Sequence, residues 1–388
     1  MSDAPQAAKP TPLPVKSDTT PRGFLVSSAP HLASGATTQR IMFEVVLAMI
    51  PLLIMATYLY HWSAIVLTVV TIIGCLAAEA IGNAMRGRSM SSLTDGSAIV
   101  TGMILAFSLP PAMASGSRVY MAFIGGLVAI ALGKAIFGGI GNNLFNPAMV
   151  GRAFLMICFP GAMALWTPTP AMMPEEIAKL ADAKGIEVSA LSGEDIDAIT
   201  TATPLTQAGK LKMAIDKANR DEEERDKHLA SAQQIRDEMP GLWRLAIGNV
   251  GGCVGETSAL MALICGLWLV LRGIADWRQP FALLVVVILF AGITHLIDPD
   301  RFQGPLYHLA SGALMFGVFF IATDYVGAPV TPWGRLIFGA GVGLFVMLIR
   351  VFGAYPEGFM FAILIMNALT PLIERWTTPT PFGGHVTA

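Results

Sequence analysis

The sequence predicts an all-α polytopic membrane protein with about ten transmembrane helices, arranged as two inverted five-helix repeats with an extracytoplasmic insertion. Of its 388 residues, 54% are hydrophobic and only 13% are charged, and the mean hydropathy is +0.61. This composition is typical of membrane proteins. The apolar residues also form long runs, and the two halves of the chain are alike in order and spacing. These three observations set the fold class.

Ten apolar runs have lengths that suit membrane crossing. A helix needs roughly 20 residues to cross the hydrocarbon core, where it satisfies its own backbone hydrogen bonds. The first half contains the runs 41–60, 64–84, 97–114, 119–137 and 147–165, and the second contains 257–271, 281–296, 306–322, 336–352 and 358–372. We therefore expect five spans in each half.

The domain organisation follows from the distribution of charge. We expect a polar cytoplasmic tail (1–40), a first five-helix repeat (41–165), a polar insertion (166–246), a second five-helix repeat (247–375) and a cytoplasmic C-terminal tail (376–388). The insertion holds 15 of the 27 acidic residues, a density that cannot lie in lipid. Residues 210–238 are predicted to form one charged, solvent-exposed helix.

The positive charges of the short loops predict the orientation, because lysine and arginine near span ends favour the cytoplasmic side. With the N-terminus inside, the inner side collects Lys9, Lys16, Arg22, Arg40, Arg86, Arg88, Lys134, Arg272, Arg278, Arg335 and Arg375. The outer side keeps Arg118, Arg301 and Arg350 in its short loops. Both termini are therefore predicted inside and the insertion outside.

Two motifs recur in the same order in both halves. Residues 98–102 lead to Pro110 and Pro111 as 313–317 lead to Pro329, and Phe137-Gly138 precede Asn146 as Phe352-Gly353 precede Asn367. With five spans per half, the second copy would be inverted relative to the first. Inverted repeats with Gly- or Pro-interrupted helices usually hold a site near the bilayer midplane.

Five acidic residues lie in or beside predicted spans: Glu44, Glu79, Glu256, Asp324 and Glu357. Intramembrane ionisable groups usually serve ion pathways or cofactors. For Glu44 and Glu79, near span ends, an ion pair with an arginine is an equally good explanation. Glu256 and Asp324 are the favoured ion-pathway residues, because they fall at Gly-rich interruptions in the second half.

Composition also argues against other classes of site. The net charge of −2 and the lack of a basic face argue against a nucleic-acid partner. The four cysteines show no CxxC spacing, so neither a zinc nor an iron–sulfur ligand set is expected. No catalytic residues are predicted within this chain.

The insertion contains the sequence Asp-Ala-Ile-Thr-Thr-Ala-Thr-Pro-Leu at 197–205. It resembles the Asp-x-x-Ser/Thr-x-Ala-Thr flavinylation motif of the family comprising the D subunit of the Rnf electron-transport complex and the B subunit of the sodium-pumping NADH:quinone reductase. Asp197, Thr200, Ala202 and Thr203 match the motif, whereas Thr201 stands where many relatives have glycine. The resemblance implies that FMN is esterified through its phosphate to Thr203 by a separate magnesium-dependent flavin transferase.

The residue types suit that chemistry. A threonine hydroxyl without a neighbouring base is a poor nucleophile, so we expect an exposed stretch that an external enzyme can recognise. Pro204 favours an extended conformation for the residue before it. A phosphodiester link leaves the flavin ring free to exchange electrons.

The resemblance extends from about residue 38 onward. Residues 94–98, 109–111 and 139–147 look like conserved segments of the first half, and 255–258 look like the start of the second. Residues 322–324 resemble an Ala-Thr-Asp-Pro signature in which Tyr325 replaces the proline. By the same resemblance, Glu256, Thr257 and Ser258 are candidate contacts of a flavin, and a second, non-covalent riboflavin is plausible.

The resemblance implies a multi-pass component of the bacterial inner membrane, with the Thr203 insertion in the periplasm. It would belong to an ion-translocating ferredoxin:NAD⁺ oxidoreductase and be active only within that complex. It would pass electrons and help couple their transfer to Na⁺ or H⁺ movement, with the A, B, C, E and G subunits of Rnf as partners and the flavin-carrying G subunit foremost. Two alternatives stay open at this point: the B subunit of the quinone reductase, and a solute channel of the urea-transporter type. The flavinylation motif favours the electron-transfer function over the channel.

Overall fold

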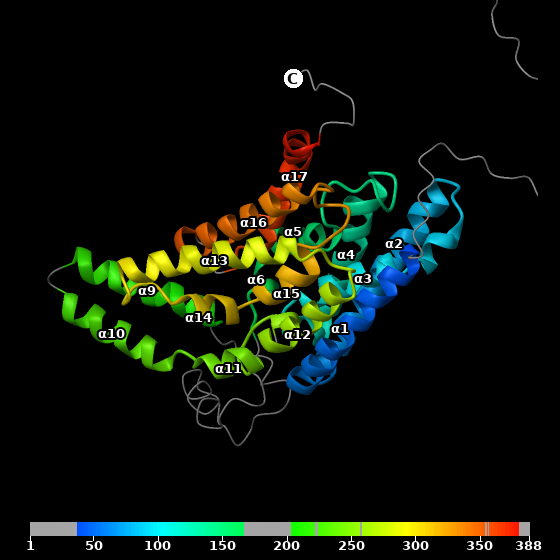
Figure 1. Ribbon diagram of the computed structural model, residues 1–388. Helices are drawn as coiled ribbons and strands as arrows, with labels where there is room; N and C mark the ends of the chain where they lie inside the picture. Colours follow the sequence, from blue (N-terminus) through cyan, green and yellow to red (C-terminus); the bar gives the residue numbers. More distant parts are fainter. Residues whose placement is uncertain are drawn as a thin grey trace, which may run out of the picture. The chain divides into compact units, whose positions relative to one another are not determined.

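The computed structural model describes residues 37–166, 203–221, 224–256, 258–353, 355 and 357–379. From residue 38 onward, the described residues belong to one compact unit. All secondary structure in these residues is helical (Figure 1). Asp197, Thr200, Ala202 and Thr257 lie outside the described residues.

Within the described part of the chain, six helical segments are long and apolar enough to cross a membrane, which indicates a membrane protein. They are α1 (Thr38–Tyr60), α2 (Trp62–Met85), the segment Gly116–Ala135 that contains α4 (Val119–Ile130), α13 (Arg278–Ile297), α16 (Pro332–Phe352) and α17 (Phe359–Thr377). Three further apolar helices are shorter: α3 (Ser97–Phe107), α5 (Pro147–Cys158) and α12 (Ala259–Leu271).

The predicted run 306–322 is not one continuous helix. It consists of α14 (Pro305–Ala310), α15 (Leu314–Phe316) and the π-helix η7 (Gly317–Ile321). Gly312 interrupts it with a φ of +69°, a left-handed conformation that glycine adopts without strain. The predicted run 97–114 is also cut short, since α3 ends at Phe107, just before Pro110 and Pro111.

Helix starts follow a common local pattern of a capping side chain followed by proline. Asn146 caps α5, Thr203 caps α9 (Pro204–Arg220) and Thr331 caps α16; each side-chain oxygen accepts a backbone N–H three residues on. Proline at the first helical position is favoured because its missing N–H has no partner to lose there. These caps fix where three elements begin.

The helices of the two halves pack in the same combinations. In the first half α2 packs on α3 and α4, and α4 packs on α5; in the second, α13 packs on α14 and α16, and α16 on α17. Figure 1 shows α13 and α16 running side by side. Across the halves, α1 contacts α12 and α5 contacts α17.

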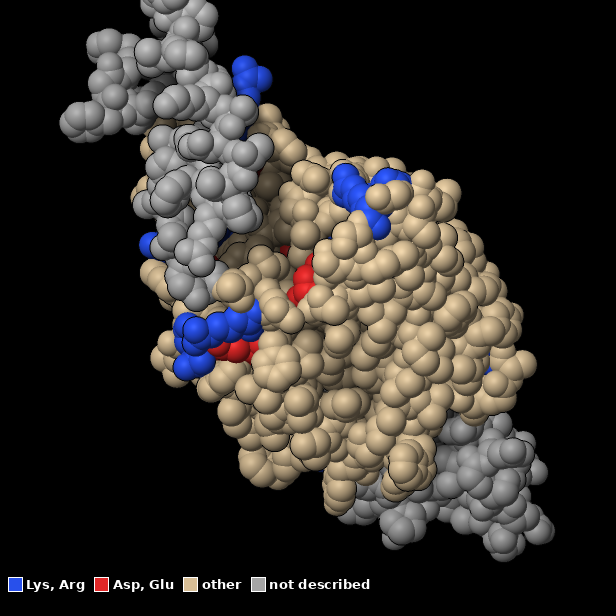
Figure 2. All heavy atoms as spheres, turned by 90° about the vertical axis from the view of Figure 1, so that its right-hand side faces the viewer, with Lys and Arg blue, Asp and Glu red and all other residues tan. Residues whose placement is uncertain are grey.

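One apolar core spans both halves, with the rings of Phe107 and Phe316 at a centroid distance of 5.5 Å. Outward-facing positions are apolar too: Leu271 is 86% exposed and Leu296 is 82% exposed. Figure 2 shows a face on which uncharged residues cover most of the described surface and the basic side chains gather in a few groups. Such a surface suits lipid rather than water.

The prediction of one helix over 210–238 is wrong. Two helices, α9 and α10 (Arg225–Glu238), pack side by side as a hairpin (Figure 1). Leu211 and Ile215 of α9 are buried against Ala232 of α10. The charged residues of this segment therefore conceal an apolar stripe on each helix, which a single solvated helix would leave exposed.

Small residues let α2 and α4 approach closely. A Cβ added to Gly74 would lie 2.4 Å from the carbonyl oxygen of Phe123, and one on Gly126 would lie 2.6 Å from that of Thr71. Small residues at such contacts are typical of helix packing in membranes, where dispersion replaces the hydrophobic effect.

Replacing Gly74 by alanine should therefore force α2 and α4 apart. We expect Gly74→Ala to lower the free energy of unfolding by about 1–3 kcal/mol, the usual range for overpacking. Gly209→Ala is the matched control, because a Cβ there meets no atom within 4 Å. Thermal unfolding in detergent measures both; equal midpoints for Gly74→Ala and the wild type would contradict the proposed close contact.

Candidate functional site: a buried charge network beside Thr203

Residues 250–256 join the second half to the first. Val254 N–H donates to Leu109 O at 3.0 Å, and the Cys253 thiol donates to Ser108 O at 3.2 Å. From α1, the hydroxyl of Tyr60 donates to the carbonyls of Val250 and Gly252. The segment is thereby held against the end of α3, and it presents Cys253 and Glu256 to the interior.

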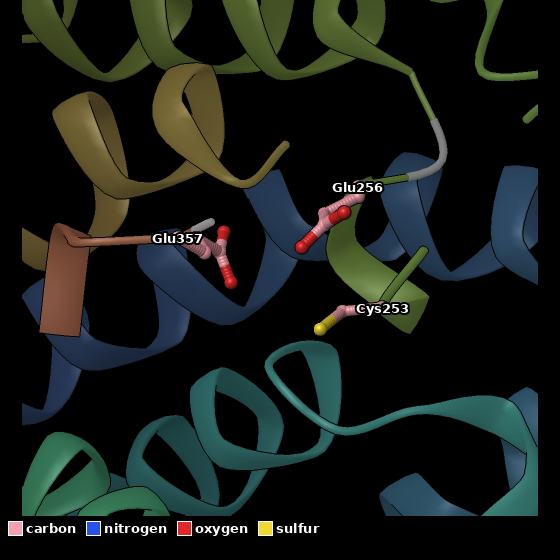
Figure 3. A group of neighbouring side chains, drawn as sticks. All are labelled: Cys253, Glu256 and Glu357. Atoms are coloured by element: carbon pink, nitrogen blue, oxygen red, sulfur yellow. The ribbon is translucent and has the colours of Figure 1, made fainter. Parts of the chain in front are cut away.

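Three side chains converge at this place. Cys253, Glu256 and Glu357 each offer a ligand-type atom within 4.8 Å of the others. Figure 3 shows Cys253 and Glu256 on one segment and Glu357 approaching them from another. Such a group resembles part of a metal site. However, the guanidinium of Arg152 already supplies the positive charge, because its Nη2 lies 2.5 Å from Glu357 Oε2 and 3.6 Å from Cys253 Sγ.

Glu357 connects the two halves. Its Oε2 accepts from Arg152, which lies on α5 of the first half, and its Oε1 accepts from Ala313 N–H at 2.8 Å in the second half. The side chains of Arg152 and Glu357 are only 7% and 12% exposed, and Arg152 Nε has no hydrogen-bond partner. The carboxylates of Glu256 and Glu357 lie close together, which disfavours their joint ionisation. Arg152 supplies positive charge to this pair directly.

The network continues to the start of α9. A Cβ on Gly312 would lie 3.6 Å from Glu357 Oε1, 3.2 Å from Arg350 Nη2 and 2.7 Å from Leu205. Arg350 donates to His308 O at 2.8 Å and to Ser311 O at 3.1 Å, and its Nε has no partner. Gly312 is therefore the point where α9, the Arg350 guanidinium and Glu357 come together.

Thr203 immediately precedes this contact. Its backbone is extended (φ −65°, ψ 155°), as Pro204 predicts, and its Oγ1 accepts the N–H of Thr206 at 3.2 Å. Pro204 O accepts from the hydroxyl of Tyr307 at 3.1 Å, which holds the turn against α14. The expectation of an exposed acceptor is wrong for Thr203 itself, which is only 6% exposed.

Asp324 lies in a different place from Glu256. It follows η7, accepts from the side-chain amide of Asn146 at 3.3 Å and caps its own turn through Val326 N–H at 3.2 Å. Asn146 N–H also donates to Asn367 Oδ1 at 2.9 Å, in the amide orientation that satisfies the neighbours of Asn367. The two asparagines of the recurring motifs thus meet beside Asp324.

A cavity of about 100 Å³ adjoins Asp324 and Asn146, with apolar walls from both halves, including Ile104 and Phe319. Next to it, the loop between α12 and α13 carries Asp276, which pairs with Arg278 and Arg335. Partial burial raises the pKa of Asp276, but the N–H of Arg278 and the guanidinium of Arg335 outweigh it and hold that pKa below its usual value. Asp276 is therefore a fixed anion at the edge of this region.

The other acidic residues of the predicted spans are paired. Glu79 Oε1 lies 2.6 Å from Lys134 Nζ, and Glu44 lies 3.1 Å from Arg272 and from Arg40. The ion-pair explanation is thus confirmed for both, although a lysine rather than an arginine partners Glu79. Ser258 accepts Met261 N–H and caps α12, which is a structural role.

Sequence reasoning missed Arg152 and did not select Glu357. A signal was present, since Arg152 is a basic residue inside a predicted apolar run and such a residue needs an anionic partner. No local pattern names that partner, because Glu357 lies 205 positions further along the chain.

These features define the class: a multi-helix membrane protein whose halves share a buried charge network next to a short motif at a helix start. The chain belongs to the NQR2, RnfD, RnfE family, whose model matches residues 25–383.

The chain is also similar to named members of the family, and the similarity covers nearly their full length. The chain is 38% identical to the D subunit of the ion-translocating oxidoreductase complex of Stutzerimonas stutzeri, over 90% of this chain and 93% of the relative. It is 36% identical to the D subunit of the Na⁺-translocating ferredoxin:NAD⁺ oxidoreductase complex of Acetobacterium woodii, over 92% and 95%. It is 33% identical to the proton-translocating counterpart of Clostridium ljungdahlii, over 93% and 96%.

Neutralising Glu357 should destabilise the fold more than any exposed charge change. We expect Glu357→Gln to lower the free energy of unfolding by about 3–5 kcal/mol, because Arg152 would stay buried without its direct ion-pair partner. Lys227→Gln, which removes an exposed pair with Glu224, is the control and should change little. Unfolding in detergent measures both; similar stabilities of the two variants would rule out the structural role assigned to Glu357.

Proposed function

We propose that this chain is the D subunit of an Rnf-type ion-translocating ferredoxin:NAD⁺ oxidoreductase complex. The observation that carries the proposal is the nearly full-length similarity to three D subunits from different bacteria. These names favour neither the B subunit of the quinone reductase nor a solute channel. The chain would act only as part of the oxidoreductase, with the other Rnf subunits as partners.

The similarity to relatives does not identify the ion that the complex would move. The relatives named for Na⁺ and for proton translocation are 36% and 33% identical to this chain. The similarity therefore does not favour Na⁺ over H⁺ for this chain.

We also infer that the chain crosses the membrane ten times, as two inverted repeats. Both termini would be cytoplasmic and the insertion periplasmic. The matching packing of α2 with α4 and of α13 with α16 supports the repeat. Many of the basic residues counted for the orientation are paired. On the predicted inner side, carboxylates pair with Arg40, Lys134, Arg272, Arg278 and Arg335. On the outer side, Arg301 pairs with Asp216 and Arg350 donates to backbone carbonyls. The remaining loop charges still favour this orientation for a protein of the inner membrane.

The proposal also includes FMN esterified to Thr203. Two features support a phosphate group at this place. The first is the N-terminus of α9, where backbone N–H groups favour an anion. The second is Arg350, which approaches Gly312 together with Leu205 and whose Nε has no hydrogen-bond partner. When bound, FMN supplies the exchange of one or two electrons. Because Thr203 is buried, the flavin transferase must reach it before Tyr307 binds the start of α9 or through a local opening.

The charge network gives a physical basis for coupling. Glu357 and Arg350 approach Gly312 together with Leu205, two residues after Thr203. A negative charge gained near Thr203 would strengthen the affinity of the Glu256–Glu357 pair for a proton or Na⁺. Asp324 would form a second binding site in the ion pathway. Non-covalent riboflavin remains a predicted additional cofactor.

Attachment of FMN is tested on the denatured chain, co-expressed with a flavin transferase. We expect flavin fluorescence in a denaturing gel for the wild type and none for Thr203→Val, which removes the acceptor oxygen. Thr206→Val is the matched control, since Thr206 shares the hydrogen bond with Thr203 at 2.8 Å but lies outside the motif. Fluorescence that persists in Thr203→Val would move the attachment site elsewhere.

A further inference from the structure

A polar pocket outside the charge network lies where α2 ends. Its volume is about 480 Å³, and its walls include Arg86, Arg88, Ser89, Ser91, Ser92 and Lys134. Arg86 and Arg88 follow α2, the serines belong to the turn before α3, and Lys134 belongs to the π-helix η4 (Ala131–Ala135) at the end of α4. We call this the Arg86–Arg88 pocket.

The pocket carries a surplus of positive charge. Lys134 is neutralised by Glu79 at 2.6 Å, and its Nζ also donates to Ser97 Oγ at 2.7 Å. In the described part of the chain, neither Arg86 nor Arg88 lies within ion-pair distance of a carboxylate. Two uncompensated guanidinium groups repel cations and favour an anionic ligand.

Both guanidinium groups are held in place by backbone carbonyls. Arg86 Nε donates to Gly82 O at 2.8 Å and its Nη1 to Ala135 O at 2.9 Å, while Arg88 Nη1 donates to Gly138 O. A guanidinium carries five N–H donors, so each retains donors for a ligand. Fixed arginine forks together with serine hydroxyls match the oxygen atoms of a phosphate.

The surroundings of the pocket indicate where the phosphate comes from. Met85 and Ile136 neighbour the lining residues Arg86 and Ala135 along the chain, and they are 83% and 68% exposed. Bare apolar side chains beside a basic pocket suit a molecule with a charged headgroup and acyl chains, whereas a soluble anion would leave them in water. Basic pockets between membrane helices bind anionic headgroups in this way.

We propose that the Arg86–Arg88 pocket binds the phosphate of an anionic phospholipid, with the acyl chains lying along Met85 and Ile136. The proposal requires that the chain resides in a membrane, and it is independent of the flavin and of the coupled ion. A bound lipid would link the ends of α2 and α4 at the membrane surface.

The test uses the full-length chain, delipidated in mild detergent and titrated with phosphatidylglycerol or with phosphatidylcholine of the same acyl chains. Native mass spectrometry measures the bound lipid. We expect tighter binding of phosphatidylglycerol, and a roughly 10-fold or greater loss of its affinity in Arg86→Gln/Arg88→Gln, because each basic residue contributes about 1 kcal/mol near an anionic surface. Arg88→Gln alone should show a smaller loss in the same direction, which keeps the test valid if the double variant does not fold.

Arg118→Gln is the matched control, since Arg118 precedes the opposite end of α4; it should bind like the wild type. Equal affinities of wild type and double variant, or no preference for phosphatidylglycerol, would overturn the proposal. A further arm adds inorganic phosphate in excess. If inorganic phosphate binds and phosphatidylglycerol does not, the ligand is a soluble anion and the assignment to lipid is wrong.

Discussion

Arg152 and Glu357 form the contact on which the arrangement of the two halves depends. Arg152 extends from α5 in the first half, and Glu357 precedes α17 in the second, where it also accepts Ala313 N–H. Neither charge could remain buried alone, because the free energy of desolvating an unpaired ion exceeds the stabilisation that it would gain from packing. The pair therefore fixes how α5, α15 and α17 approach one another, and it places a carboxylate next to Glu256.

The same constraint orders the rest of the interior. Glu79 forms an ion pair with Lys134, and Asp324 accepts a hydrogen bond from Asn146. Arg350 donates hydrogen bonds to two backbone carbonyls. Each contact lies at an interruption of regular helix: Lys134 in a π-turn, Asp324 after η7, and the partners of Arg350 at the break around Gly312. Interruptions free backbone groups and make room for charged side chains, and for that reason broken helices and buried charge occur together.

Composition and hydropathy predict the class well, because the bilayer imposes helices and an apolar exterior on any chain of this kind. The starts of three helices can be predicted from the sequence, because Asn146, Thr203 and Thr331 each precede a proline and cap the helix. The break at Gly312 was not predicted, since a lone glycine in an apolar run is compatible with a continuous helix. The α9–α10 hairpin was hidden by the charges that surround its apolar stripe.

At the site, the motif at Thr203 and the acidic residues in apolar runs are visible in the sequence, but their partners are not. Glu79 with Lys134 and Arg152 with Glu357 are separated by 55 and 205 positions, and only the packing of helices brings them together. The burial of Thr203 is likewise a tertiary effect, produced where Tyr307 holds the start of α9. A local pattern cannot report such contacts.

A double-mutant cycle on Arg152 and Glu357 tests most directly whether this pair unites the two halves. The free energies of unfolding of Arg152→Met, Glu357→Met and the double variant would be compared with that of the wild type. We expect the double variant to be more stable than either single variant, since it leaves no unpaired buried charge. Losses that simply add would contradict this account, because they would mean that the two charges do not depend on each other.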